Sequence, residues 1–282
     1  MRACLDCIPC FIQQGLEAAR MVSNDEMIQE QVIRKIIRYL INTKLDRSPP
    51  LISEQIHDII RQNTNSNDPY EKIKKQQNEF ALKSYPRLKK IMAESEDRML
   101  TALKIAIAGN VIDYGTMLRL DVESTLQKVL NTNLNTDTYV KFRNILLKTK
   151  KVLYIGDNAG EIVFDKLLIE ELIKLNVSVT YAVRSGPIIN DVTIEDAKLV
   201  GLDKIAEIIT TGTRSPGVVL ETCSDDFNRA FNDSDLIISK GQGNYEGLPV
   251  KVNLFKLLMV KCELVVREIG DSVKVGDIMF IN

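Results

Sequence analysis

The chain has a single histidine in 282 residues, His57, and this scarcity argues against an active site that relies on histidine acid–base chemistry. It also lacks an excess of positive charge, because 37 lysines and arginines are balanced by 38 acidic residues. No apolar run reaches the roughly 18 residues that a transmembrane helix needs. We therefore expect a protein that binds neither nucleic acid nor membranes.

Cysteine is scarce as well. The five cysteines are an odd number in a long chain, which argues against a disulfide framework. The N-terminus is interrupted by Asp6 and does not resemble a signal peptide, so we predict a cytoplasmic protein. Cys4, Cys7 and Cys10 have CxxCxxC spacing. This spacing suits either a structural zinc ion, with a fourth ligand from elsewhere, or three small side chains that pack along one stripe of a helix.

Glycine is rare in the first part of the chain, where only three of the 14 glycines lie before residue 150. Apolar residues there recur at helical spacing, which predicts an all-helical domain over residues 1–148. The expected helices are Phe11–Val22, Ile28–Leu40, Ile52–Ile60, Pro69–Ala81, Tyr85–Met92, Met99–Ala108, Val122–Leu130 and Thr136–Leu147.

Residues 149–282 alternate short apolar runs with helical patterns, which predicts βαβ units. The expected strands are Val152–Ile155, Val177–Val183, Ala206–Ile209, Asp235–Ser239 and Leu264–Arg267, with a hairpin or edge strand near Gly276. The predicted fold class is α/β, a three-layer α/β/α Rossmann-like arrangement with a mostly parallel sheet, preceded by the helical domain.

The segment Lys151–Glu161, KVLYIGDNAGE, is the most informative part of the sequence. Asp157 and Asn158 fall between a buried strand and a helix that starts near Gly160, where open α/β sheets bind ligands. The helix N-terminus suits a phosphate, and a carboxylate beside a phosphate requires a hard cation such as Mg²⁺ or Mn²⁺. A metal-and-phosphate site is one interpretation. Simple capping of the helix by Asp157 and Asn158 is the other.

Two further loops follow predicted strands. Asp191 is free to bind a ligand, because Thr193 and Asp196 resemble a capping box for the next helix. Lys240 ends a strand and precedes Gly241, a combination typical of an anion-binding nest. A solvated acid and an ordinary glycine turn are the alternatives. Since the carboxyl ends of parallel strands share one edge of a sheet, we expect all three loops to converge.

The segment AGNVIDYG closes a helix of the first domain. Asn110 and Asp113 are three residues apart and share one helix face. Their side chains either reach the predicted crevice or form hydrogen bonds locally at the helix end.

At GDNAGE, PIINDVT, KGQGNYE, AGNVIDYG and CLDCIPCF, the chain resembles the metal-dependent damage-control phosphatases, over nearly its whole length. The resemblance implies a helical domain followed by an α/β/α domain. It also implies hydrolysis of phosphate monoesters, such as sugar phosphates and phosphopantetheine-type metabolites, with a divalent cation. The residues that it implies are the metal ligands Asp157, Asn158 and Asp191, the phosphate-binding Lys240, and the substrate-side Asn110 and Asp113.

We therefore expect a phosphatase for a small phosphorylated metabolite, with Mn²⁺, Co²⁺, Ni²⁺ or Mg²⁺ as cofactor and Asp157 and Lys240 in the reaction. Attack by a metal-activated water and a phospho-aspartate at Asp157 both remain open. One rival is an S-adenosylmethionine methyltransferase, although the second strand ends in Val183-Arg184 and lacks the acid that binds the ribose. The other is a non-enzymatic metabolite-binding module that uses the same crevice.

Overall fold

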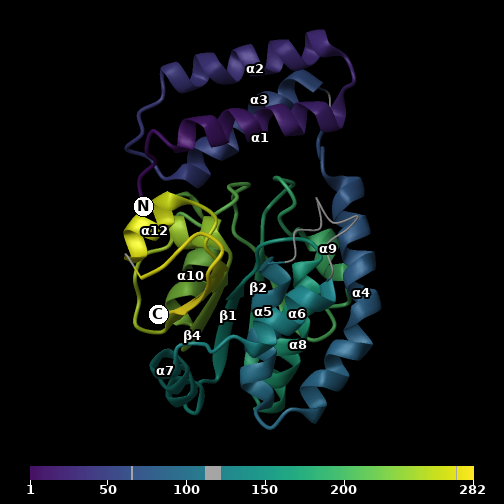
Figure 1. The fold of residues 1–282 in the computed structure, drawn as a ribbon, viewed down its shortest axis with the longest axis vertical. Helices are drawn as coiled ribbons and strands as arrows, with labels where there is room; N and C mark the ends of the chain where they lie inside the picture. Colours follow the sequence, from purple (N-terminus) through teal and green to yellow (C-terminus); the bar gives the residue numbers. More distant parts are fainter. Residues whose placement is uncertain (65, 112–121, 271) are drawn as a thin grey trace.

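The computed structural model describes residues 1–64, 66–111, 122–270 and 272–282. Helices α1–α3 form a layer across one end of the sheet, and further helices, among them the long α4, flank the strands (Figure 1). The helices are α1 Cys7–Val22, α2 Glu26–Ile41, α3 Pro49–Thr64, α4 Glu71–Glu94, α5 Arg98–Val111, α6 Val122–Asn131, α7 Thr136–Leu146, α8 Glu161–Lys174, α9 Ile194–Leu199, α10 Asp225–Asp233, α11 Gln242–Gly247 and α12 Glu263–Ile269, with a 3₁₀ turn at Leu220–Thr222. The predicted α/β class with a helical N-terminal region is confirmed.

Within the described residues, six strands form one sheet in the order β3-β2-β1-β4-β5-β6. They are β1 Lys151–Ile155, β2 Ser178–Val183, β3 Glu207–Thr210, β4 Leu236–Lys240, β5 Leu254–Met259 and β6 Ile278–Ile281. All neighbours are parallel except β6, which pairs antiparallel with β5. The chain moves from β1 to one side of the sheet and later returns to its other side at β4. This reversal is a topological switch point, where open α/β sheets bind ligands.

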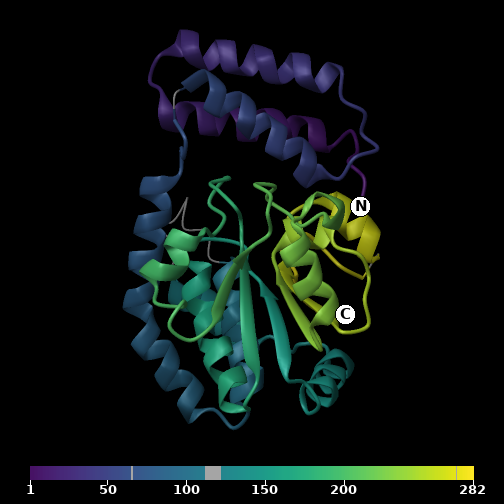
Figure 2. The same ribbon diagram turned by 180° about the vertical axis from the view of Figure 1, so that it is seen from behind.

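Side chains of β1 alternate between the two faces of the sheet. Val152 and Tyr154 belong to the core that includes α5 and α8, whereas Leu153 and Ile155 pack with Phe227 of α10. Because successive residues of a strand point to opposite faces, this division accounts for the layers on both sides of the sheet, seen from the back in Figure 2.

One predicted strand is wrong and one strand was missed. Leu264–Arg267 lies in helix α12, although two valines there favour a strand. The edge of the parallel array is instead β5, whose sequence LFKLLM is rich in leucine, a good helix former. Lys256 fits in this buried strand because its ammonium lies over the ring of Tyr245 and donates a hydrogen bond to the carbonyl of Leu248 at 3.3 Å. Tertiary contacts therefore override local propensity at both segments.

The other predicted elements are found within a few residues of their expected bounds. The two helices expected at Pro69–Ala81 and Tyr85–Met92 are one helix, α4, that continues through Pro86. The predicted edge strand near Gly276 is β6. No helix in the described part of the chain is long and apolar enough to span a membrane.

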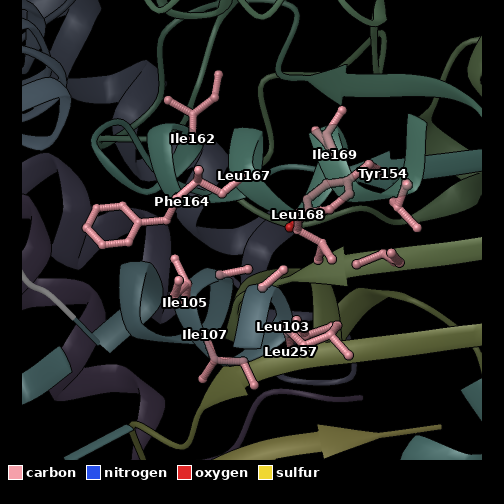
Figure 3. Close-up of a cluster of buried hydrophobic side chains, with 14 of the residues drawn as sticks. Leu103, Ile105, Ile107, Tyr154, Ile162, Phe164, Leu167, Leu168, Ile169 and Leu257 are labelled. Carbon is pink, nitrogen blue, oxygen red and sulfur yellow. The ribbon is translucent and has the colours of Figure 1, made fainter. Parts of the chain in front are cut away.

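The hydrophobic cores divide the chain differently from the predicted domain boundary at residue 148. Buried residues of α4–α8 share one core with the sheet, and the α5–α8 contact is its centre, shown by Leu103, Ile105 and Phe164 in Figure 3. Helices α1–α3 have a separate core. The helical part of the chain therefore consists of an α1–α3 layer with its own core and of helices that belong to the core of the α/β unit.

Polar contacts hold the α1–α3 layer over the carboxyl ends of the strands. Arg61 of α3 donates a hydrogen bond to the carbonyl of Pro187 at 3.1 Å, and Thr213 donates one to Glu54 of α3 at 3.1 Å. The N-terminal amino group donates to the carbonyl of Glu246 at 2.7 Å. The loops after β2, β3 and β4 are therefore tied to the N-terminal part of the chain that lies over them.

Candidate metal and phosphate site

The turn after β1 is joined to the loop after β2. Asn158 and Asp191 form an isolated antiparallel bridge, and the N–H of Val192 donates to the carbonyl of Asp157 at 2.8 Å. Asp157 and Asn158 do not cap helix α8. Its N-cap is Gly160, whose N–H donates instead to Asn78 of α4 at 2.7 Å. These contacts bring two of the three predicted loops together and leave the side chains of Asp157 and Asn158 free of a capping role.

The carboxylate of Asp157 is held by two amides. Its Oδ2 accepts hydrogen bonds from Asn158 Nδ2 at 2.7 Å and from Asn110 Nδ2 at 2.9 Å. Asn110 also contacts Glu161 at 3.0 Å and accepts the N–H of Met259 at 3.1 Å. Asn110 therefore reaches the site from α5 and orients Asp157. Asp113, which was predicted to accompany it, lies outside the described residues.

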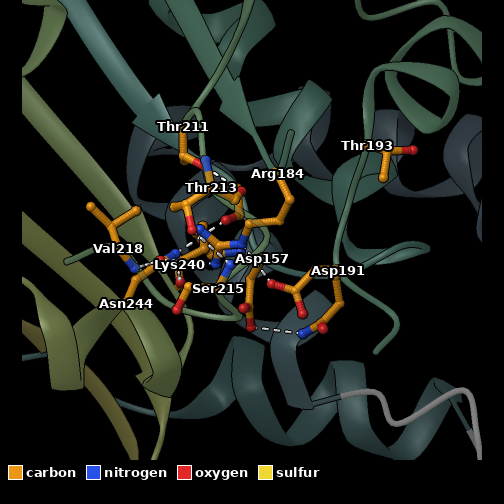
Figure 4. A network of polar contacts seen from close by, with 12 residues as sticks. Asp157, Arg184, Asp191, Thr193, Thr211, Thr213, Ser215, Val218, Lys240 and Asn244 are labelled. Carbon is orange, nitrogen blue, oxygen red and sulfur yellow. Dashed lines mark hydrogen bonds and ion pairs between the residues drawn. The ribbon is translucent and has the colours of Figure 1, made fainter. Parts of the chain in front are cut away.

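Asp191 is buried rather than free on a loop. Its Oδ2 accepts Nε of Arg184 at 2.7 Å, and both side chains are almost fully buried. Arg184 also donates to Asn244 Oδ1 at 2.9 Å, and Asn244 donates in turn to the carbonyl of Lys240 at 2.7 Å (Figure 4). The predicted capping box of Thr193 is present, so Asp191 has no capping role.

Sequence reasoning missed Arg184 as a site residue. The signal was available, because an arginine that directly follows a buried strand has to find a buried anion. Asn244 was also missed. It lies one turn into the helix that follows Lys240, and its amide joins the loops after β1, β2 and β4 by donating to the carbonyl of Gly156 at 3.1 Å.

Lys240 points away from the loop crevice into the protein. Its side chain has no exposed surface, and its ammonium donates to the carbonyl of Ala106 at 2.8 Å, to Asp165 at 2.7 Å and to Glu161. An ammonium has three N–H donors, and these three acceptors use them all. The role of Lys240 as a phosphate ligand stays a prediction, and these contacts favour a different one, in which Lys240 neutralises Glu161 and Asp165 beneath the site.

Gly241 allows the backbone to approach Asp157 closely. Its φ is 80°, and a Cβ at this position would lie 1.9 Å from Asp157 Oδ2. Only glycine therefore fits. The N–H of Gly241 donates to the carbonyl of Leu257 at 2.9 Å, so this donor of the predicted anion nest is already used. The part of Gly241 in substrate binding stays a prediction, whereas its steric role beside Asp157 is clear.

The electrostatics of the site favour a bound cation. Burial, with the nearby charges of Glu161 and Asp191, raises the pKa of Asp157 to about 8. Burial also raises the pKa of Asp191, although the guanidinium of Arg184 opposes the rise. Crowded, buried carboxylates are stabilised in their charged form by a nearby cation. Two carboxylates and the amide oxygen of Asn158 are hard oxygen donors, which fit a divalent ion such as Mg²⁺ or Mn²⁺.

Asp157, Asn158 and Asp191 border a cavity of about 330 Å³ beneath the α1–α3 layer. Phe11, Gln14, Pro50 and Ser53 form part of its helical wall, and the loops form its floor. Gln14 accepts a hydrogen bond from Ser53 at 3.0 Å. The cavity therefore has a charged floor and a mixed apolar and amide roof.

The N-terminal cysteines reach the same cavity. Cys7 and Cys10 line it, and the sulfur atoms of Cys4 and Cys7 are 3.9 Å apart. Burial raises the pKa of Cys7 to about 12, which disfavours the thiolate that zinc requires. No group of three or more His, Cys, Asp or Glu side chains within the described ranges is arranged to hold a metal. A structural zinc at these cysteines stays a prediction.

Comparison with known proteins identifies the family. The profile of the damage-control phosphatase ARMT1-like domain matches residues 3–275. The chain belongs to this family. It is 34% identical to a damage-control phosphatase of Archaeoglobus fulgidus, over 97% of this chain and 96% of that protein.

A solved structure shows the same fold in a relative. The crystal structure of a DUF89 family protein from Pyrococcus horikoshii matches this damage-control phosphatase family member with a TM-score of 0.90 and 31% sequence identity, over 100% of this chain and 99% of that one. A mouse 4'-phosphopantetheine phosphatase is 28% identical over 56% of this chain but only 23% of the mouse protein. The predicted family is confirmed, and its named members indicate a phosphatase.

Proposed function

We propose that the protein is a metal-dependent phosphatase that hydrolyses a small phosphorylated metabolite, in a damage-control role. The observation that carries the proposal is the convergence of Asp157, Asn158 and Asp191 at the edge of the cavity, at the switch point of the sheet. Three oxygen donors leave the remaining positions of a divalent ion open to water and phosphate, as catalysis requires.

The residues of the chain have separate tasks. Asp157, Asn158 and Asp191 would hold the divalent cation, which supplies Lewis-acid polarisation of a phosphoryl oxygen when bound. Asn110 fixes one oxygen of Asp157 through a 2.9 Å hydrogen bond, and Arg184 fixes one oxygen of Asp191 at 2.7 Å. Among the described residues, the second oxygen of each carboxylate accepts no hydrogen bond, which leaves it available to the cation. Such supporting contacts orient ligands and tune the metal.

The cavity supports a substrate of limited size. Its 330 Å³ lies within the range of pockets for small molecules, and the α1–α3 layer closes it from above. Sugar phosphates and phosphopantetheine-type metabolites both carry hydroxyl or amide groups that could pair with Gln14 of the roof. The mouse relative, whose name gives 4'-phosphopantetheine as its substrate, favours including that compound among the first tested.

A substrate screen tests the proposal. Purified protein is stripped with EDTA and assayed for phosphate release from sugar phosphates, 4'-phosphopantetheine and p-nitrophenyl phosphate, with Mg²⁺, Mn²⁺, Co²⁺ or Ni²⁺ added back. We expect no hydrolysis in the stripped protein and recovery with at least one ion. Hydrolysis that persists in EDTA would contradict metal dependence. No hydrolysis with any ion and substrate would favour the alternative of a binding module.

A further inference from the structure

Hydrolysis of a metabolite phosphate is helped by a proton donor on the side of the leaving group. When the ester P–O bond of an alkyl phosphate breaks, the alkoxide that forms leaves slowly unless a proton reaches it in the same step. His57, the single histidine of the chain, is not among the residues that line the cavity. A proton donor from the protein therefore has to be another titratable side chain of the cavity wall.

Glu246 is placed along this wall, next to the proposed metal site. Helix α11 begins directly after Gly241, where an added Cβ would overlap Asp157 Oδ2. The helix therefore starts beside the metal site, and its residues Gln242, Gly243 and Glu246 line the cavity. At a rise of about 1.5 Å per residue, Glu246 lies roughly 7 Å further along the helix than Gly241. A phosphate ester held at the metal site can direct its leaving oxygen along the same wall.

A hydrogen-bonded amide orients the carboxyl group of Glu246. Gln242 Nε2 donates to Glu246 Oε1 at 2.7 Å, and Gln242 Oε1 accepts the backbone N–H of Lys261 at 2.7 Å. The second contact fixes which end of the amide faces Glu246. Because Oε1 has to accept this N–H, a proton on the carboxyl group is carried by Oε2. Among the described residues, Oε2 accepts no hydrogen bond, so its proton is available to a ligand in the cavity.

The surroundings of Glu246 keep it partly protonated near neutral pH. The residue is 8% exposed, and burial raises its pKa to about 7. The hydrogen bond from Gln242 opposes this rise, as do the charges of the N-terminal amino group and of Lys261. The thiols of Cys7 and Cys10 face it from α1, and burial, with charges that include Glu246, raises the pKa of both. A carboxyl group with a pKa near the working pH is suited to general acid catalysis.

The other acidic groups of the wall, apart from the proposed metal ligands, are less suited. Asp6 has an exposed side chain that forms an ion pair with Arg267 at 2.8 Å, and Glu263 is exposed. Burial raises the pKa of Cys7 to about 12, so this thiol is too weak an acid near neutral pH. Among the described residues, Glu246 is therefore the one buried carboxyl group of the wall that is not assigned to the metal.

We propose that Glu246 is the general acid that protonates the leaving oxygen of the substrate. The assignment rests on the proposed phosphatase function. As the ester P–O bond breaks, its electron pair passes to the leaving oxygen, which takes the proton from Glu246 Oε2. The attacking water forms the new P–O bond and loses one proton to solvent, from which Glu246 is protonated again. The products are an alcohol and inorganic phosphate, and the proton donation is the same if Asp157 attacks first and water then releases the phosphate.

The test compares Glu246→Gln with Glu263→Gln, a matched control that removes an exposed carboxylate from the same cavity wall. Glutamine keeps an oxygen that accepts from Gln242 but has no acidic proton. The probes are p-nitrophenyl phosphate and benzyl phosphate, both assayed with Mn²⁺. The two esters are similar in size, but p-nitrophenolate is a stabilised anion that leaves without a proton, whereas the benzyl alkoxide needs one.

The loss should depend on the leaving group. We expect Glu246→Gln to lower kcat/KM for benzyl phosphate by about 10²-fold or more, the scale of general acid catalysis, and to leave kcat/KM for p-nitrophenyl phosphate near the wild-type value. Retained hydrolysis of p-nitrophenyl phosphate would also show that the variant is folded and binds the metal. Glu263→Gln should match the wild type with both esters.

The pH profile is a second measurement. A general acid acts in its protonated form, so wild-type kcat/KM for benzyl phosphate, relative to that for p-nitrophenyl phosphate, should fall as the pH rises through about 7. This decline should be absent in Glu246→Gln. An equal loss with both esters, or no loss with either, would overturn the assignment, as would a wild type that hydrolyses p-nitrophenyl phosphate alone. A wild type with no metal-dependent hydrolysis of either ester would instead contradict the proposed function.

Discussion

Replacing Lys240 with methionine tests whether this lysine is a structural cation or a phosphate ligand. The substitution keeps most of the side-chain volume but leaves Glu161 and Asp165 without the ammonium, in a site with almost no exposed surface. Breaking one partner of a buried ion pair typically costs about 3–5 kcal/mol. We therefore expect Lys240→Met to lower the free energy of unfolding by about that amount, a large part of the stability of an ordinary domain.

The assay is urea denaturation followed by far-ultraviolet circular dichroism, with the midpoint and slope fitted by linear extrapolation. In the wild type, burial and the charge of Glu161 raise the pKa of Asp165 to about 6, although the charge of Lys240 opposes the rise. Without Lys240 that pKa should rise further, so protonation at low pH relieves the unpaired charge. The destabilisation should accordingly shrink between pH 8 and pH 5.

A matched variant removes the charges together. Lys240→Met combined with Glu161→Gln and Asp165→Asn should be more stable than Lys240→Met alone, because no uncompensated charge is then buried. If the free energy of unfolding of Lys240→Met at pH 8 is within about 1 kcal/mol of the wild-type value and hydrolysis is lost, the structural role is refuted. Lys240 would then be a phosphate ligand, as the sequence predicts.

Three other substitutions probe the site and the α1–α3 layer. Gly241→Ala should destabilise the protein by about 1–3 kcal/mol and abolish hydrolysis. The alanine Cβ would overlap Asp157 Oδ2, and the backbone conformation is one that only glycine adopts. Wild-type kinetics in this variant would show that the loop can move aside. Asn110→Ala should weaken Mn²⁺ binding about 10–100-fold by calorimetry, as losses of supporting contacts do; unchanged affinity would remove Asn110 from the site. Burial, with the nearby charge of Arg61, lowers the pKa of His57 to about 3. The neutral imidazole therefore contributes its full stabilisation above the unfolded pKa of about 6.5. As the pH falls from there toward 3, the free energy of unfolding should decrease by up to about 5 kcal/mol. His57→Leu should flatten the dependence of unfolding free energy on pH in that window, and an unchanged slope would assign it to other groups.

The sequence predicted the sheet centre well because its strands are short, apolar and bounded by glycine or polar residues. Val152–Ile155, and Leu236–Ser239 within the predicted Asp235–Ser239, have no competing pattern, since they are buried on both faces. At the edge of the sheet the local signal fails. The leucines and the lysine in Leu254–Met259 do not predict a strand. This segment is a strand because it pairs with β4 and β6.

The site was predictable as far as topology determines it. Asp157 and Asp191 follow neighbouring parallel strands, so their convergence follows from the fold class. The direction in which a side chain points does not follow from the fold class. Lys240 and Gly241 adjoin in sequence, yet the ammonium turns inward to Asp165 on α8, and only the three-dimensional packing of α5 and α8 against β4 creates that buried cluster of charge.

The central claim is that Asp157, Asn158 and Asp191 hold a catalytic divalent cation, and Asp157→Asn tests it most directly. The substitution removes one negative charge and almost no volume. Since burial and the charges of Glu161 and Asp191 raise the pKa of Asp157 to about 8 without metal, a neutral amide should keep the stripped protein as stable as the wild type or more so. The measurement is the Mn²⁺ concentration that gives half-maximal phosphate release, in EDTA-stripped wild type and Asp157→Asn. We predict full dependence on Mn²⁺ in the wild type and at least about a hundredfold higher requirement, or no recovery, in the folded variant. Equal activity of the two proteins at the same Mn²⁺ concentrations, or full wild-type activity without any metal, would contradict the account.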